Sequence, residues 1–346
     1  ARGWEEEAGV AAVTPKVVRA LRSPLTPLPQ SENRTTLNKN GIYQFEQASK
    51  CKEIQDNILS SSIKKKRYSE DYYLHIVTKL QNCTWVRKPE ESIKFRSELA
   101  SCCDAVHNFI ASQSNIPLGS NMSYEVDSKK TILITEDIFK MLPVSSPLSV
   151  YPFKNCAVVG NGGILKNSSC GAEIDSSDFV FRCNLPPTTG NISKDVGNKT
   201  NLVTVNPSII AQKYNKLNEK KTEFLENVAV YGDAFLLLPA FSFRSNTATS
   251  FKVYHTLKEF KATQRAIFFH PTYLRSLAQF WRTKGVKAYR LSSGFMITSA
   301  ALELHHYYDN QLPKPGFHAM PKEYNQILQL HGKGILKLQF GKCESD

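Results

Sequence analysis

The chain has 346 residues, 41% of them hydrophobic, which excludes a chain that is disordered throughout and allows one large domain without requiring a second. Its 44 Lys and Arg residues outnumber 31 Asp and Glu residues and give a formal charge of +13 at pH 7. This balance favours anionic ligands or surfaces, such as a nucleotide, a nucleic acid or an acidic glycan, although a basic surface without a partner explains it equally well. No apolar run is long enough to span a bilayer, so we expect any targeting segment to lie upstream of Ala1 or to be missing.

Residues 1–65 have the composition of a tether. Prolines recur there among Ser, Thr, Asn and Glu with little hydrophobic periodicity, which is typical of a flexible, largely disordered segment. A basic run at 64–67 closes it. Nucleic-acid binding is one interpretation of this run, but no aromatic residues are interleaved with it, which favours a solvated face.

From about residue 71 to residue 110, apolar residues recur at helical spacing and predict helices packed on the domain. These residues are Leu74, Val77, Leu80, Val106, Phe109 and Ile110. They carry no obvious chemistry.

The stretch 156–207 says most about function. An apolar strand at Ala157–Val159 is followed by a glycine turn, a helix-like interval, a second strand at Phe179–Phe181 and a third at Leu202–Val205. This order is typical of a nucleotide-binding α/β layer, with the phosphate at the glycine turn. Further short apolar runs have the spacing of strands that alternate with helices. They lie at 228–231, 235–238 and 266–269.

The glycine turn begins like the dinucleotide fingerprint G-x-G-x-x-G, with Gly160 and Gly162 in the first two glycine positions. Leu165 replaces the third glycine and would obstruct the close packing of helix on strand, which disfavours a nicotinamide enzyme. Asn161 offers a side-chain amide beside the backbone N–H groups, which suits a phosphate or a carboxylate. A plain strand-to-helix turn without a ligand remains the alternative.

A second candidate anion site is formed by Ser292, Ser293 and Gly294, directly before the apolar stretch 295–304. Small polar residues at the start of a helix leave N–H groups and the positive end of the helix dipole pointing outward, which suits a phosphate. Ordinary N-capping explains the same residues. Just upstream, residues 273–284 predict an amphipathic helix that ends at Gly285.

Histidines cluster near the C-terminus, in 305–309 and around His318. His318 lies between a Pro/Gly-rich loop and a helix opened by Pro321, which predicts access to solvent, and its reference pKa suits a base near neutrality. Glu323 falls in the first turn of that helix, where the dipole favours a carboxylate, so a structural cap is its preferred interpretation. For any single histidine, an ordinary surface or core position is the alternative.

The cysteines show no CxxC or Cys/His spacing of a zinc site, which favours disulfides and an oxidising compartment. They are Cys51, Cys83, Cys102, Cys103, Cys156, Cys170, Cys183 and Cys343. Six Asn-x-Ser/Thr sequons indicate the same compartment, although each is a weak match by itself. The candidate glycosylation sites are Asn33, Asn82, Asn121, Asn167, Asn191 and Asn198.

Taken in order, these motifs resemble those of the animal α-2,8-sialyltransferases of glycosyltransferase family 29. Residues 156–207 resemble the large sialylmotif, 270–304 the first part of the small sialylmotif, and 306–309 motif III. His318 and Glu323 resemble the very small motif H-x4-E. Four ordered motifs, in a match through nearly all of residues 70–346, are far more specific than any one of them.

The resemblance implies a single Rossmann-like α/β/α domain at 66–346, similar to a GT-A variant, with a central and mostly parallel sheet. The stem at 1–65 would precede it. It also implies a type II membrane protein of the Golgi apparatus, with its catalytic domain in the lumen and a membrane anchor upstream of this chain. Nucleic acid is then not expected as a partner.

The reaction implied is transfer of sialic acid from CMP-sialic acid to the 8-hydroxyl of a terminal sialic acid on a glycoprotein or glycolipid, with inversion and without a metal or other cofactor. Position by position, Asn161 and Asn184 match asparagines that contact the donor. The matches to the donor loop are Ser292, Ser293 and Gly294. His306 matches the histidine near the leaving phosphate, and His318 matches the catalytic base. The absence of an Asp-x-Asp pair agrees with a reaction that needs no metal.

One departure from the family pattern follows Leu304. In relatives, this helix is followed by a cysteine, a strand and an aromatic Gly-Phe-Trp loop, whereas here Leu304 runs directly into His305. The resemblance implies that Cys156 has lost its disulfide partner, whereas Cys170 can still pair with Cys343. Loss of such a bridge costs roughly 2–5 kcal/mol. We therefore expect little or no transferase activity from this chain. A non-catalytic lumenal protein that binds a glycan or nucleotide is the alternative.

Overall fold

The computed structural model describes residues 39–60, 75–76, 79–80, 83–148, 153–161, 165–304, 320–339 and 342–343. Its centre is a sheet of five parallel strands in the order β3-β4-β5-β6-β7. The strands are β3 (Cys156–Val159), β4 (Phe179–Arg182), β5 (Leu202–Thr204), β6 (Phe235–Leu238) and β7 (Arg265–Phe268). Almost every strand residue is buried, as is typical of parallel strands covered on both faces. The predicted α/β class with a parallel central sheet is confirmed.

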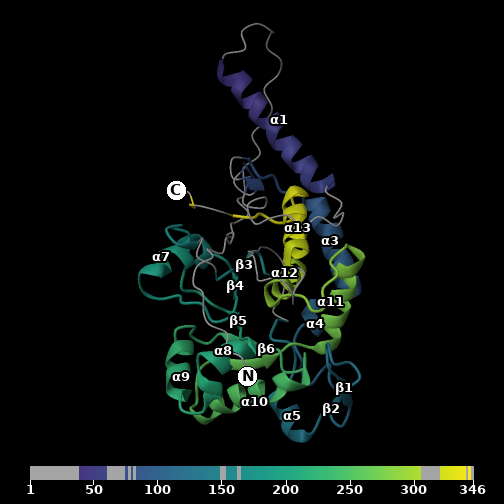
Figure 1. Ribbon diagram of the computed structural model, residues 1–346, viewed down its shortest axis with the longest axis vertical. Helices are drawn as coiled ribbons and strands as arrows, with labels where there is room; N and C mark the ends of the chain where they lie inside the picture. The colour runs from purple at the N-terminus through teal and green to yellow at the C-terminus, as the bar shows by residue number, and fades with distance from the viewer. Residues whose placement is uncertain are drawn as a thin grey trace, which may run out of the picture.

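Helices cover both faces of the sheet, which gives three layers (Figure 1). Leu237 and Ile267 belong to the core on one face, whereas their neighbours Leu236, Leu238 and Phe268 belong to the core on the other. The first core contains α3 (Pro89–Cys102), α11 (Pro271–Thr283), α12 (Ser293–Leu304) and α13 (Met320–Gly332). The second contains α5 (Glu136–Met141), α8 (Pro207–Gln212), α9 (Lys221–Ala229) and α10 (Arg244–Glu259).

Shorter elements complete the domain. Strands β1 (Asn121–Ser123) and β2 (Thr131–Leu133) form a separate antiparallel pair. The remaining short helices are α4 (Ala105–Asn108), α6 (Gly171–Asp175), η2 (Gly190–Ile192), α7 (Ser193–Val196) and η3 (Asn215–Leu217).

The apolar run at 228–231 was predicted as a strand, and this prediction is wrong. Val228 lies in the last turn of α9, and the run ends in a turn at Gly232. Phe224 and Val228 are both buried and are four residues apart, so together they form the buried face of a helix. The predicted amphipathic helix is confirmed as α11, and Gly285, with φ of 94°, follows it in the left-handed region that favours glycine.

Helix α1 (Lys39–Ser60) projects from the domain and contacts it through its C-terminal end (Figure 1). Ile58 is buried there, and α1 packs against α13. A disulfide between Cys51 and Cys83 ties the helix to the segment before α3. The helix lies within the segment predicted to be a largely disordered tether, and contacts distant in sequence hold it. Among the described helices, none is both long and apolar enough to cross a membrane.

Helix α12 is buried from Phe295 to Leu304, and two buried hydrogen bonds tie it to α11 and α4. Trp281 Nε1 donates to Ser299 Oγ at 2.9 Å, and the N–H of Ala105 at the start of α4 donates to Glu303 Oε1 at 2.5 Å. Glu303 is only 3% exposed. Burial raises the pKa of Glu303 to about 7, although the bond from Ala105 opposes the shift.

We predict that Glu303 makes stability fall as pH rises from about 4.5 to about 7. A carboxyl with a raised pKa holds its proton more tightly in the folded chain than in the unfolded chain, so ionising it costs folding free energy over that interval. Relative to the parent, Glu303→Gln should therefore gain stability between pH 5 and pH 8, by at most about 3 kcal/mol. Thermal or urea unfolding across this range measures the difference.

Glu98→Gln is the control for this prediction, because a hydrogen bond from Lys284 lowers the pKa of Glu98. Glu98 is then ionised in both states above pH 5, so its variant should differ from the parent by a constant amount. A pH-independent difference for Glu303→Gln would contradict the assignment.

Candidate functional site

Three asparagines follow three neighbouring strands of the sheet. Asn161, Asn184 and Asn206 each lie two residues beyond the end of β3, β4 and β5, respectively. Because neighbouring parallel strands end at the same edge, these residues lie along one edge of the sheet, where α/β proteins bind their ligands. Asn206 was not identified from the sequence. Its position directly after an apolar run, shared with the other two, is the signal that could have found it.

Asn184 links the ends of β4 and β5. Its backbone N–H donates to Thr204 Oγ1 at 3.0 Å, and its side-chain Oδ1 accepts from the N–H of Asn206 at 3.1 Å. Asn184 has a φ of 55°, in the left-handed region that Asn tolerates better than most residues. The two bonds fix both the loop and the orientation of the amide side chain.

The serine loop, which we define as Ser292, Ser293 and Gly294, meets the same edge. Ser293 Oγ donates to Asn206 Oδ1 at 3.2 Å, and Ser292 Oγ accepts from the N–H of Phe295 at 3.1 Å as a cap of α12. A side-chain carbon added at Gly294 would lie 3.6 Å from the sulfur of Cys183, so the loop passes close to the end of β4. The structure thus brings the serine loop, Asn206 and Asn184 together.

The other predicted site residues are not joined to this group. Asn161 is exposed after β3, and no hydrogen bond among the described residues links it to the serine loop. Its neighbours in the glycine turn, residues 162–164, lie outside the described residues. His306 and His318 also lie outside them, so their roles stay predictions.

Glu323 lies in the first turn of α13, which begins at Met320. Its carboxyl reaches across to the serine loop, where Oε1 accepts from the N–H of Ser292 at 3.2 Å. Glu323 is 1% exposed, and burial raises its pKa to about 7, although bonds from Ser292 and the charge of Arg290 oppose the shift. This contact spans two distant segments, which the interpretation of Glu323 as a helix cap did not anticipate.

A buried ion pair holds the chain just before the serine loop. Arg290 Nε donates to Glu125 Oε2 at 3.0 Å, and both side chains are less than a tenth exposed. Arg290 also donates to Ser242 Oγ at 3.1 Å. Arg290 lies within the motif-like stretch 270–304, but Glu125 is 165 residues away and lies in no motif, so no local pattern predicts this pair.

Disulfides involve six of the eight cysteines. The structure joins Cys170 to Cys343, the pairing that the resemblance implied, and also joins Cys102 to Cys103. Cys156 is buried in β3 and forms no disulfide. Burial raises the pKa of its thiol, which makes the thiol unreactive.

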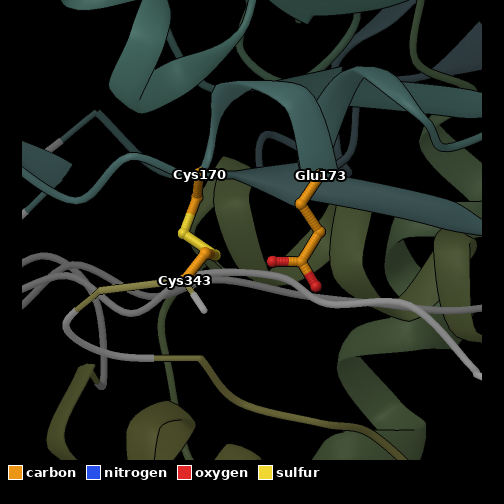
Figure 2. Close-up of side chains that lie close together, drawn as sticks. All are labelled: Cys170, Glu173 and Cys343. Carbon is orange, nitrogen blue, oxygen red and sulfur yellow. A yellow bond between two sulfur atoms is a disulfide. The ribbon is translucent and has the colours of Figure 1, made fainter. Parts of the chain in front are cut away.

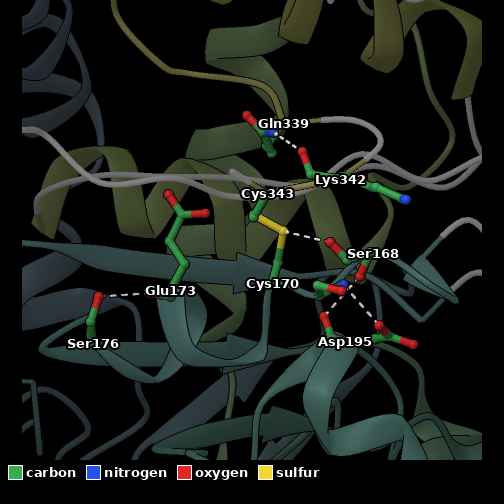
Figure 3. The surroundings of a disulfide bond; sticks show 9 residues. Ser168, Cys170, Glu173, Ser176, Asp195, Gln339, Lys342 and Cys343 are labelled. Carbon is green, nitrogen blue, oxygen red and sulfur yellow. Dashed lines mark hydrogen bonds between the residues drawn. A yellow bond between two sulfur atoms is a disulfide. The ribbon is translucent and has the colours of Figure 1, made fainter. Parts of the chain in front are cut away.

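The two cysteines of the Cys170–Cys343 bridge and the nearby Glu173 make up a group of three potential metal ligands. Glu173 lies beside the two cysteines (Figure 2), and together they form the kind of cluster that can hold a metal ion. Both sulfurs are consumed by the disulfide, however, so they offer no thiolate while it is intact. Asp195 lies close to Ser168 beside this bridge (Figure 3). Its carboxylate fixes the adjacent loop by accepting from the backbone N–H groups of Asn167 and Ser169, each at 2.8 Å. The disulfide and the Asp195 contacts therefore hold the loop at 167–170 in place.

Four of the six sequons lie in the described part of the chain. Their asparagines are all exposed, which glycosylation requires. They are Asn121, Asn167, Asn191 and Asn198. Asn33 and Asn82 lie outside the described residues.

Comparisons with known proteins agree on one family. The family model of glycosyltransferase family 29, the sialyltransferases, matches residues 105–304. Human alpha-2,8-sialyltransferase 8F is 62% identical over 353 residues, which cover 96% of this chain and 88% of that protein. Rat alpha-2,8-sialyltransferase 8E is 42% identical over 322 residues, which cover 86% and 84%, respectively. A crystal structure of a mammalian sialyltransferase is 19% identical, with a TM-score of 0.40, and covers 81% of this chain and 88% of that one. The alignment with the human protein is longer than this 346-residue chain, so some residues of that protein have no counterpart here.

We predict that removing the Cys170–Cys343 bridge by a double substitution to serine costs more stability than removing Cys51–Cys83. The two bridges span 173 and 32 residues, and a longer closed loop restricts the unfolded chain more. The chain-entropy relation gives a difference of about 1.5 kcal/mol. Urea unfolding of the two double variants measures it, and an equal or smaller loss for the Cys170/Cys343 variant would contradict this prediction.

Proposed function

Because the chain belongs to the sialyltransferases of glycosyltransferase family 29, we propose that it is built to transfer sialic acid from CMP-sialic acid to the 8-hydroxyl of a terminal sialic acid. The family makes it a glycosyltransferase. The linkage is proposed from relatives that are named alpha-2,8-sialyltransferases and are 62% and 42% identical. The acceptor would be a sialylated glycoprotein or glycolipid.

One observation carries the proposal: the serine loop at the start of α12 meets the ends of β4 and β5 through Asn206 and Asn184. The start of a helix presents N–H groups and positive dipole charge, which suit the phosphate of CMP. Asn184 would supply its side-chain amide from the same edge, with Asn161 contributing from the neighbouring strand. The net charge of +13 also favours a donor and an acceptor that are both anionic.

In the proposed reaction, His318 takes the proton of the acceptor hydroxyl as that oxygen bonds to the anomeric carbon of the donor. General-base assistance of this kind contributes roughly 10²–10⁴-fold. The sugar passes through an oxocarbenium-like state, and attack from the face opposite the leaving CMP inverts the anomeric centre. Charge growing on the CMP phosphate is stabilised by the N–H groups of α12 and by His306 when protonated. Because these groups neutralise the leaving phosphate, the proposal needs no metal ion or other cofactor.

We place the protein in the Golgi apparatus, with this domain in the lumen and a membrane anchor upstream. Three disulfides support an oxidising compartment. Exposed sequons support passage through the compartments where asparagine glycosylation occurs.

We further propose that the chain as written has little or no transferase activity. Three observations support this: the family match ends at Leu304, the human alignment is longer than the chain, and Cys156 is buried without a bridge. Residues that separate α12 from motif III in relatives would be missing. His306 and His318 would then be displaced, whereas the contacts among Asn184, Asn206 and the serine loop do not depend on that segment. This favours, as a second candidate, a lumenal protein that binds nucleotide without transfer.

Incubation of the purified chain with CMP-sialic acid and a sialylated acceptor tests the proposal, with human alpha-2,8-sialyltransferase 8F as the active control. We expect turnover far below the control together with CMP binding by calorimetry. Turnover comparable to the control would overturn the proposed impairment. If the chain shows no turnover and also fails to bind CMP, the proposed donor site is wrong.

The role of the base is tested in the active control, where the histidine that matches His318 is replaced by alanine. We expect kcat to fall at least 100-fold while CMP affinity stays unchanged, because the base acts on the acceptor and not on the nucleotide. A loss of less than tenfold would show that another group takes the proton.

A further inference from the structure

Ser292 is held by two different helices. Its carbonyl and Oγ accept from the N–H groups of Met296 and Phe295, at 2.9 and 3.1 Å, so it begins α12. Its own N–H donates to Glu323 Oε1 at 3.2 Å. One carboxyl from α13, 31 residues away in sequence, therefore accepts from the backbone of the residue that caps α12.

Burying the carboxyl of Glu323 costs folding free energy. It is 1% exposed, beside the buried side chains of Tyr324 and Ile327 on the same helix, and its second oxygen has no partner among the described residues. The nearby cation Arg290 already pairs with Glu125. A buried carboxyl with one unsatisfied oxygen is destabilising relative to an apolar side chain of the same size. A gain in folding stability therefore does not explain why a glutamate occupies this position. Its hydrogen bond to Ser292, which positions the serine loop, does.

We propose that Glu323 is a positioning residue, which orients the serine loop for the donor phosphate and couples that loop to the helix that follows His318. The inference rests on the proposed function only in taking the serine loop as the phosphate site. The loop then has three anchors: Arg290 on Glu125 before it, Ser293 on Asn206 within it, and Ser292 on Glu323. The first two bind it to the body of the domain. The third alone connects it, among the described residues, to α13.

The coupling follows from the geometry of the chain. Helix α13 begins at Met320, two residues after His318, and Glu323 lies one turn further along. A shift of the first turn of α13 would move the carboxyl away from Ser292, so the loop and this turn must move together. The donor loop and the first turn of α13 are thereby kept in register.

Calorimetry with CMP tests the inference on the full chain. We expect Glu323→Ala to weaken CMP binding about tenfold or more, as when a charged hydrogen-bond acceptor is removed. Glu323→Gln keeps an oxygen for Ser292 and should cost about threefold or less. The matched control is Glu303→Gln, which alters an equally buried carboxyl at the other end of α12 and should change CMP affinity less than twofold. A loss in Glu323→Ala no larger than in the control would overturn the inference.

Hydrogen exchange of the Ser292 amide separates this inference from the proposed function. In Glu323→Ala without nucleotide, that amide should exchange at least tenfold faster than in the parent, and in Glu303→Gln it should not change. If the parent fails to bind CMP but the amide behaves in this way, the donor site is wrong and the positioning contact stands. If the parent binds CMP but the amide exchange is unchanged, the inference fails alone.

Discussion

The architecture depends on one helix, α12, that is buried along its length except at its first two residues. Every residue of α12 from Phe295 to Leu304 is buried, and the helix packs against β3, α3 and α4. A helix enclosed in this way cannot turn or slide without opening cavities, whose cost rises with their volume. Its N-terminus is therefore fixed against the ends of β4 and β5. Core packing sets the edge at which the serine loop lies, and the hydrogen bonds of Ser292 and Ser293 orient the loop there.

The two halves of the proposed reaction are built by different parts of the chain. The donor side consists of strand ends and a helix start, which the sheet and α12 hold rigidly. The proposed acid–base groups, His306 and His318, come from the segment that joins α12 to α13. Glu323 is the described contact that joins the second half to the first.

Much of the fold follows from local sequence, whereas the contacts that organise the site do not. The strands at 157–159, 202–205 and 235–238 were predictable because continuous apolar runs between turn residues are typical of a buried parallel sheet. Val228 was misassigned because a short apolar run fits the end of a buried helix as well as a strand. The bonds of Asn184 to Asn206 and of Glu323 to Ser292 join segments 22 and 31 residues apart, which no local pattern encodes.

A structure of the chain with bound CMP would show whether the start of α12 and the ends of β4 and β5 form a nucleotide site. We expect the phosphate within hydrogen-bond distance of the backbone N–H groups of the serine loop, with the Asn184 amide on the same nucleotide. CMP bound elsewhere, with the serine loop unoccupied at saturating nucleotide, would contradict it.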